Sequence, residues 1–390
     1  MKKKIIFVTK ALWIGGIETA LINLLNHFNY NKYDVTLLVL HGELNLLGQV
    51  RPECRVLVAD RGEKNTFSKK YQYEGLYHLT EDSSNPSIFH KIMMWSVPII
   101  KWIENELYIR YVRKAMKEER FDVAIIYSDV VAEIGIRSIN ASRFLMFYHH
   151  GKMRHVYHDR IAYRKCDNII AVSNNQANEL KKYVPQAAGK IVSIHNMTDV
   201  EGIHIKANSN IQEVFDPNKF NIVSVGRVSY EKGMDIAVKV CAKLVEKGLR
   251  NICWWIIGDG PAFQEVQNVI KKFKMEKYIV MVGMRSNPYP YISQADLYVQ
   301  PSRFEGYPMT ILEALVLGQP VISTDNNGAK EILQDGVTGL LCPANVEALA
   351  GKIISVMKNP ELYNILKQNV QNIDFKGANE RVVKMLENLL

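Results

Sequence analysis

The feature that most constrains this chain is an alternation of short apolar strands with helical segments, which runs once through each half. A helical period links Leu21, Leu24, Leu25 and Phe28. In the first half the pattern predicts strands at 4–9, 35–40, 56–59, 122–127, 144–148, 168–172 and 190–194. Strands that alternate with helices in this way form parallel, doubly wound sheets. We therefore expect an α/β fold.

The second half begins the alternation again and predicts a second sheet. Its expected strands are 220–225, 253–257, 278–282, 297–300 and 320–323, with a helix over 234–246. Most of these strands run directly into turns of small residues, at Gly226, Gly258-Asp259-Gly260, Gly283 and Pro301-Ser302. Ligands of parallel sheets bind beyond the carboxyl ends of the strands, so these turns predict a binding site.

A boundary between two domains is expected within residues 198–218, which are polar and carry no clear period. We predict an N-terminal Rossmann-like domain at 1–200 and a C-terminal one at 201–375, facing each other across a central cleft. Residues 376–390 form a closing segment with an apolar helical stripe from Val382 to Leu390. From its own sequence, this helix could pack on the rest of the chain or form a dimer contact.

Residues 61–120 are too long for an ordinary connection between strands and predict an insertion. Its central part, 88–116, reads as a helical hairpin or a long helix kinked at Pro98. Apolar aromatics such as Trp95 and Trp102 stand close before basic residues such as Arg110 and Arg113. This composition is typical of a helix lying in a membrane interface, and a core helix remains the alternative.

Nearly all of the net positive charge lies in the first half of the chain. Residues 1–200 hold 28 Lys and Arg against 20 Asp and Glu, a net +8 of the total +9. No nucleic-acid motif accompanies this excess, so we expect anionic lipid or phosphate as its partner and no nucleic acid. The five scattered cysteines and the missing apolar stretch of transmembrane length predict a cytoplasmic protein, peripheral on the inner face of the plasma membrane.

Two loops of the second half carry the residues expected to do chemistry. Gly226-Arg227 and Lys232-Gly233 follow the first strand and place two cations among glycines, where a phosphate can approach. The other loop contains Glu305 and Gly306 and leads into a helix that includes Glu313. Pro308 is expected as an early helical residue, so that the helix N-terminus offers free N–H groups to phosphate.

In these motifs the chain resembles the retaining GT-B glycosyltransferases, and specifically glycosyltransferase family 4 of bacterial surface polysaccharide synthesis. The resemblance is densest from Gly226 to Leu341 and takes in Glu305-Gly306, Glu313-Ala314 and Gly336-Val337-Thr338-Gly339. Upstream it includes Gly15-Gly16-Ile17-Glu18, His150-Gly151, Val172-Ser173 and Ile194-His195-Asn196. Residues 61–120 lie largely outside it. The resemblance also implies that the C-terminal helix, at 376–390, crosses back to the N-terminal domain.

The resemblance implies a role for each matching position. Glu305 would contact the donor sugar and Glu313 the ribose, while Arg227 and Lys232 bind the diphosphate. His150 would lie near the sugar hydroxyls, and matches better than His149. The expected donor-binding residues are Gly15, Gly16, Gly226, Gly283, Arg285, Gly306, Tyr307, Pro308, Met309, Thr310 and Glu313. The implied donor is a nucleotide-diphosphate sugar, UDP by family frequency, with no bound metal and no other cofactor.

The implied reaction is a retaining transfer of the sugar to a lipid-linked or polysaccharide acceptor at the membrane. Two other functions stay open: an inverting transferase that uses a histidine base, and a non-catalytic scaffold that binds sugar nucleotides. The Glu305 and Glu313 pair speaks against the first, and the complete set of site residues against the second. A dehydrogenase is excluded because Gly15-Gly16 does not belong to a G-x-G-x-x-G motif.

Overall fold

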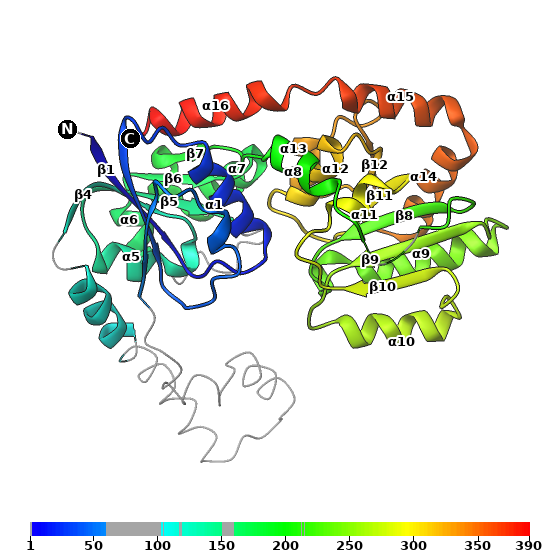
Figure 1. Cartoon of the computed structure of the whole chain (residues 1–390), viewed down its shortest axis with the longest axis horizontal. Helices are drawn as coiled ribbons and strands as arrows, with labels where there is room; N and C mark the ends of the chain where they lie inside the picture. The colour runs from blue at the N-terminus through cyan, green and yellow to red at the C-terminus, as the bar shows by residue number, and fades with distance from the viewer. Residues whose placement is uncertain are drawn as a thin grey trace, which may run out of the picture. The chain divides into compact units, whose positions relative to one another are not determined.

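The computed structural model describes residues 2–59, 103, 105–116, 119–149, 160–211, 213 and 215–390. These residues pack into two compact units. The first takes in 2–13, the described part of 28–148, and 160–169. The second takes in 14–27, His149 and the described part of 170–390. Figure 1 traces the chain from the blue N-terminal strand to the red closing helix.

A seven-stranded sheet forms from the first half of the chain, in the order β3-β2-β1-β4-β5-β6-β7. The pairs β1–β2, β1–β4, β2–β3 and β4–β5 are all parallel. The strands are β1 (Lys3–Thr9), β2 (Tyr33–Val39), β3 (Arg55–Val58), β4 (Arg120–Ile126), β5 (Asn140–Tyr148), β6 (Asn168–Ala171) and β7 (Ile191–Ser193). Ile5, Ile6, Phe7 and Val8 of the central β1 are fully buried, as expected of a strand covered on both faces.

The second half forms a six-stranded sheet in the order β10-β9-β8-β11-β12-β13, with every pair parallel. Its strands are β8 (Phe220–Val225), β9 (Ile252–Ile257), β10 (Ile279–Gly283), β11 (Leu297–Gln300), β12 (Val321–Thr324) and β13 (Leu340–Cys342). The prediction of two doubly wound parallel sheets is confirmed.

Helices connect the strands of both sheets (Figure 1). They are α1 (Gly16–Asn26), α5 (Ala132–Ser138), α6 (Arg160–Lys165), α7 (Asn174–Tyr183), α8 (Val200–Ala207), α9 (Met234–Glu246), α10 (Phe263–Phe273), α11 (Tyr289–Ser293), α12 (Met309–Val316), α13 (Asn327–Ile332), α14 (Val346–Lys358), α15 (Pro360–Gln371) and α16 (Phe375–Glu387). Short 3₁₀ turns occur at η1 (Leu47–Gln49), η2 (Asp129–Val131), η4 (Pro185–Lys190) and η5 (Tyr230–Lys232).

The second sheet is buried on both faces, and β9 shows why its sequence is a continuous apolar run. Alternate side chains of a strand point to opposite faces. Trp254 and Ile256 pack with residues of α9, α10 and α14, whereas Trp255 and Ile257 pack with residues of α8, α11 and α12. Both faces therefore need apolar side chains, and the strand carries no polar alternation.

Three predictions about elements need correction. The strand at 320–323 is not the last one, because β13 follows and pairs with β12. Leu340 and Cys342 lie in the buried core, but the run of Leu340–Cys342 is too short to carry a clear period. The second correction concerns the C-terminal helix α16, which ends at Glu387 rather than Leu390. It begins at Phe375, where the Asp374 side chain caps it by accepting from the N–H of Gly377.

The third correction concerns the predicted insertion, since β4 already begins at Arg120, inside the range 61–120. Most of that range lies outside the described residues, including Pro98, Trp95 and Trp102. Within 88–116, residues 105–115 are helical. None of the helices in the described part of the chain is both long and apolar enough to cross a membrane.

The closing helix α16 is joined to the segment after β7. The side chain of Asn379 accepts from the N–H of Thr198 at 3.2 Å and donates to its carbonyl at 2.7 Å. Phe375, at the start of the helix, packs with Ala20 of α1 and with Met309 and Leu312 of α12. These contacts fix the first turns of α16 within the second unit.

Gly233 decides how closely two loops of the second sheet approach. It lies at φ +65 between η5 and α9, and a β-carbon there would stand 2.1 Å from the carbonyl oxygen of Pro301. Gly248 has a similar φ of +85, but its added β-carbon would meet nothing within 4 Å. Of these two glycines, therefore, only Gly233 is required by packing as well as by the left-handed backbone.

We predict that Gly233→Ala lowers the free energy of unfolding by roughly 3 kcal/mol, since it adds a backbone clash to the left-handed penalty. Gly248→Ala is the matched control and costs only about 1 kcal/mol, from the backbone alone. Urea unfolding midpoints at a constant m-value measure both changes. Equal losses in the two variants would contradict the close approach at Pro301.

Candidate active site

The centre of the site is an ion pair between Lys232 and Glu305. The Lys232 Nζ lies 2.7 Å from Glu305 Oε1 and 2.8 Å from Oε2, so it donates to both oxygens. The Glu305 side chain is only 7% exposed, and that of Lys232 is 25% exposed. An ammonium carries three donors, so this pairing leaves one N–H of Lys232 for a ligand.

The loops that carry these two residues are joined by their backbones as well. The N–H of Arg303 donates to the carbonyl of Glu231 at 2.7 Å. The Arg303 guanidinium forms two bonds with the carboxylate of Asp235 in α9, at 2.7 and 2.8 Å. A bidentate pair fixes orientation as well as distance. The position of Lys232 against Glu305 is therefore built by the loops and does not depend on the ion pair alone.

Gln300, the last residue of β11, organises the polar groups around Glu305. Its amide nitrogen donates to Glu305 Oε1 at 2.9 Å and to the Ser302 hydroxyl at 2.7 Å. Its amide oxygen accepts from Tyr298 at 2.7 Å and from Thr310 at 3.3 Å. Ser302 also donates to Glu305 Oε1 at 2.7 Å. A buried network in which every member is bonded holds the carboxylate in one orientation.

Glu313 is a buried carboxyl one helical turn inside α12. It is 6% exposed, and its Oε1 accepts from the hydroxyl of Tyr289 at 3.3 Å. Burial raises the pKa of Glu313 to about 7, against smaller lowering effects of the Tyr289 hydrogen bond and of the charges on Lys206 and Lys232. The charge of Lys232 thus acts on both glutamates.

The N-termini of two helices meet beside these residues. The predicted position of Pro308 inside α12 is wrong, because Pro308 is the N-cap and Met309 the first helical residue. No side chain caps α12, and none caps α1 at Gly15. A β-carbon on Gly16 would lie 3.7 Å from the Met309 side chain. Two uncapped N-termini this close together favour an anion.

Arg227 follows Gly226 at the end of β8, and its side chain is exposed. Within the described part of the chain it forms no hydrogen bond or ion pair with another residue. Its charge is thus available to an external ligand, in contrast to that of Lys232.

Arg285, expected with Gly283 in the donor site, is held by its neighbours. Its guanidinium donates to Glu213 at 2.5 Å and to the hydroxyl of Tyr291 at 3.2 Å, and Tyr291 in turn bonds to Glu213. The hydrogen bonds to Tyr291 and Glu213 raise the pKa of the guanidinium further above its ordinary value. Its charge is therefore paired within the protein, and the neighbouring Met284, in the turn after β10, is exposed.

Of the two histidines at the end of β5, only His149 is among the described residues. His150 and Gly151 lie outside the described residues. His149 directly follows β5 and is buried, with 8% of its surface exposed.

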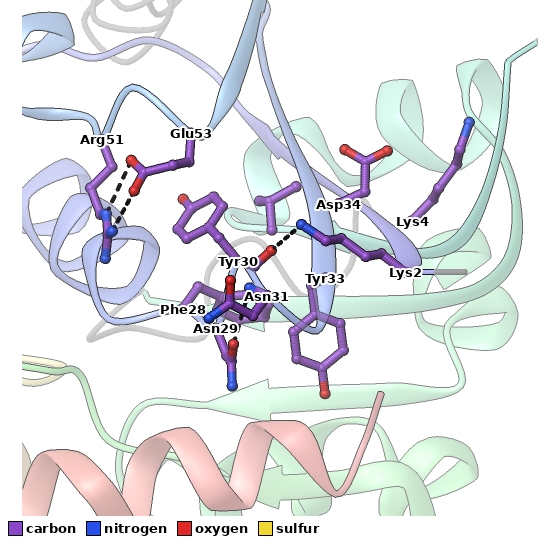
Figure 2. A pocket seen from close by; sticks show the side chains of 11 residues that line it. Lys2, Lys4, Phe28, Asn29, Tyr30, Asn31, Tyr33, Asp34, Arg51 and Glu53 are labelled. Atoms are coloured by element: carbon purple, nitrogen blue, oxygen red, sulfur yellow. Dashed lines mark hydrogen bonds and ion pairs between the residues drawn. The ribbon is translucent and has the colours of Figure 1, made fainter.

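A separate hollow of about 560 Å³ lies in the first unit, at the amino ends of β1 and β2. Figure 2 shows Lys2 bonded to the carbonyl of Tyr30, and Arg51 paired with Glu53. Lys4, which also lines it, lies 3.7 Å from Glu119. This is the edge opposite to the carboxyl ends, where ligands of parallel sheets bind, so it is not the predicted donor site.

Five further residues of the site had no predicted role, although Ser302 lies in a predicted binding turn and His195 in a motif that carries the family resemblance. Gln300 and Ser302 bond to Glu305, Tyr289 bonds to Glu313, and His195 and Glu331 lie beside Tyr307. Gln300 and Ser302 stand at a predicted strand end, which is the signal that could have found them. Tyr289 and Glu331 come from other segments and give no such signal. Among the residues described, no three His, Cys, Asp or Glu side chains are grouped to hold a metal ion.

Two protein-family models match the chain. The model described as "Glycosyltransferase Family 4" matches residues 14–201, and the one described as "Glycosyl transferases group 1" matches residues 206–373. Together they extend over both sheets except for β1. The second covers every residue of the two loops and of α12 described above.

Curated relatives are similar to parts of the chain. A Campylobacter jejuni N-acetylgalactosamine-N,N'-diacetylbacillosaminyl-diphospho-undecaprenol 4-alpha-N-acetylgalactosaminyltransferase is 28% identical over 188 residues, 48% of this chain and 49% of the relative. A putative colanic acid biosynthesis glycosyltransferase of Escherichia coli is 27% identical over 180 residues, 43% of this chain and 44% of the relative. The chain spans about half the length of the curated relatives it matches.

Among solved structures, Anabaena HepE in complex with UDP superposes with a TM-score of 0.70 and 16% identity, over 99% of this chain and 100% of that one. At this identity the likeness concerns the fold, which is the GT-B arrangement of two Rossmann-like sheets.

Glu313 predicts a pH dependence of stability. Between the ordinary carboxyl pKa and about 7, the folded protein keeps a proton that the unfolded chain has released, so this group lowers stability as pH rises. We expect Glu313→Gln, which cannot titrate, to gain roughly 2–3 kcal/mol over the wild type between about pH 5 and about pH 8. Urea unfolding of both proteins at the two pH values measures it. A difference that does not change with pH would contradict the buried, protonated carboxyl.

Proposed function

Because the chain belongs to the group 1 glycosyltransferases of the GT-B fold, we propose that it is a retaining glycosyltransferase that moves a sugar from a UDP-sugar to a lipid-linked or polysaccharide acceptor. The observation that carries this proposal is the meeting of Lys232, Glu305 and the uncapped N-terminus of α12. A cation and free N–H groups suit a diphosphate, and the fixed carboxylate beside them suits sugar hydroxyls.

We assign the parts of the donor to the site as follows. The diphosphate lies at the N-termini of α12 and α1, with Arg227 and the remaining N–H of Lys232 as its cations. Glu305 accepts from hydroxyls of the donor sugar. Glu313, deeper in α12, accepts from the ribose. The turn after β10, at Gly283 and Arg285, borders the base.

The reaction follows from these positions. The bond between the anomeric carbon and the β-phosphate oxygen breaks, and the acceptor oxygen bonds to the same face of that carbon. The proton of the acceptor hydroxyl passes to the departing phosphate oxygen, so no protein nucleophile is needed. Arg227, Lys232 and the helix N-terminus stabilise the negative charge that develops on the leaving diphosphate. Catalysis then rests on electrostatics and positioning.

The proposed donor and acceptor classes come from similar proteins and from the charge of the first half of the chain. UDP is favoured because HepE, which shares the fold, is bound to UDP. A lipid-linked acceptor is favoured because the Campylobacter jejuni relative is named for a diphospho-undecaprenol substrate. The net +8 of residues 1–200 suits such an acceptor at an anionic membrane on the cytoplasmic side, which the protein would contact peripherally.

Lys232→Ala and Glu305→Ala are each expected to reduce turnover by at least about a hundredfold, since each removes charge placed for the transition state. Turnover is measured as UDP release with an accepted acceptor. Lys239→Ala is the matched control, because Lys239 forms an ion pair with Asp235 on α9 and touches neither glutamate. Near-normal turnover in the first two variants, with unchanged folding, would refute the assignment.

A thermal-shift screen with nucleoside diphosphates and their sugars tests the donor class. A ligand that binds only the folded protein raises its Tm. At a ligand concentration of a hundred times Kd, the free energy of unfolding increases by about 2.7 kcal/mol. We expect the largest shift with UDP or a UDP-sugar. A larger Tm shift with another nucleotide would show that the donor carries a different base. The absence of a shift with every nucleotide would contradict the proposed donor site.

A further inference from the structure

Tyr307 belongs to residues 305–308, here called the catalytic loop, and contacts a histidine from another part of the second unit. It lies two residues after Glu305 and directly before Pro308, the N-cap of α12. Its ring is stacked on that of His195 with centroids 5.0 Å apart and planes at 18°. On the apolar side it packs with Ala20, Met309 and Leu312. Movement of this ring therefore moves the connection between Glu305 and the helix N-terminus.

Glu331 of α13 lies beside His195. The His195 Nε2 is 3.4 Å from Glu331 Oε2, within ion-pair distance when the imidazole is protonated, and it has no hydrogen-bond partner among the described residues. The Glu331 side chain is only 9% exposed. It also accepts from the N–H of Asn175 at 2.8 Å and from the side chain of Asn174 at 3.0 Å. Donors in the first turn of α7 thus fix both oxygens of the carboxylate.

The same helix α13 supports the catalytic loop directly. A β-carbon on Gly328 would lie 2.8 Å from the carbonyl oxygen of Gly306 and 2.8 Å from Pro308. The backbone of α13 therefore touches the loop on one side of Tyr307, while Glu331 reaches it through His195. Loop residues 305–308 are held at two points by one helix.

We propose that His195 and Glu331 are positioning residues, which hold Tyr307 so that Glu305 and the N-terminus of α12 stay in register for the donor. The proposal deepens the proposed function and rests on it for the identity of the ligand. Neither residue touches the donor in this scheme. Glu331 acts through His195, and His195 acts through its stacked ring on Tyr307.

Three substitutions distinguish the stacking of His195 on Tyr307 from the contact between helices α7 and α13. His195→Phe keeps an aromatic ring against Tyr307 and gives up the contact with Glu331, whereas His195→Ala gives up both. Glu179→Gln is the control for docking. Glu179 accepts from Asn327 at 2.8 Å, so this change weakens the contact between α7 and α13 without touching His195 or Glu331.

Hydrogen exchange of the ligand-free protein tests the positioning without any assumption about function. We expect exchange of the backbone amides in 305–310 to rise roughly threefold to tenfold in His195→Ala, the range that loss of an aromatic pair gives. Glu331→Gln should raise it less, and His195→Phe should stay within about twofold of the wild type. Equal protection of 305–310 in His195→Ala and the wild type would overturn the proposal, as would a rise in Glu179→Gln equal to that in His195→Ala.

Binding of UDP, measured by calorimetry, links the loop to the donor. We expect the Kd for UDP to rise roughly threefold to tenfold in His195→Ala and to be restored in His195→Phe. A His195→Phe variant as weak as His195→Ala would show that ring stacking is not what holds the loop. If the wild type binds no UDP, the proposed donor class fails, while the exchange result still decides whether Tyr307 is held by His195.

Discussion

The site depends on one interaction, the bond of Lys232 to both carboxylate oxygens of Glu305. These residues come from loops at the ends of two neighbouring strands, β8 and β11. The loops approach closely only because Gly233 has no side chain to meet the carbonyl of Pro301. The Arg303 pair with Asp235 then ties the loop after β11 to the start of α9. The ion pair is thus held by backbone geometry, which lets it serve a ligand without holding the fold together.

The two glutamates are buried alike but have different hydrogen-bond donors. Glu305 is 7% exposed but receives donors from Lys232, Gln300 and Ser302. Glu313 is about as deeply buried, has one hydroxyl donor at 3.3 Å, and has a pKa raised to about 7. A carboxyl in this state gains most from a ligand that brings new hydrogen-bond donors, since these favour its charged form. The ribose hydroxyls of the proposed donor are such groups.

Beyond the ion pair, the catalytic loop is braced by residues that belong to other segments of the second unit. His195 follows β7, Glu331 lies on α13, and Asn174 and Asn175 begin α7. Each contact is modest alone, but together they leave the connection from Glu305 to α12 little freedom. Such support matters where rate depends on placing charge against a developing charge rather than on a protein nucleophile.

The order of strands and helices was readable from the sequence, because periodicity and small-residue turns are local properties of a segment. The same signals placed Arg227, Lys232, Glu305 and Glu313 beyond strand ends or in the helix that follows. Local signals failed where a boundary depends on a neighbour: β13 is too short to show a period, and Pro308 is the N-cap rather than a helical residue. His150 lies outside the described residues and stays a prediction.

What only the tertiary structure decided is which side chains meet. Lys232 and Glu305 are 73 positions apart, and nothing in either loop says that one ammonium will donate to both oxygens of the other's carboxylate. Likewise Arg285 is paired with Glu213, and His195 is stacked on Tyr307. Sequence determines the residue types at each strand end, since these follow from local chemistry. Contacts between distant segments follow from strand order and loop packing, which are set only when the whole sheet is assembled.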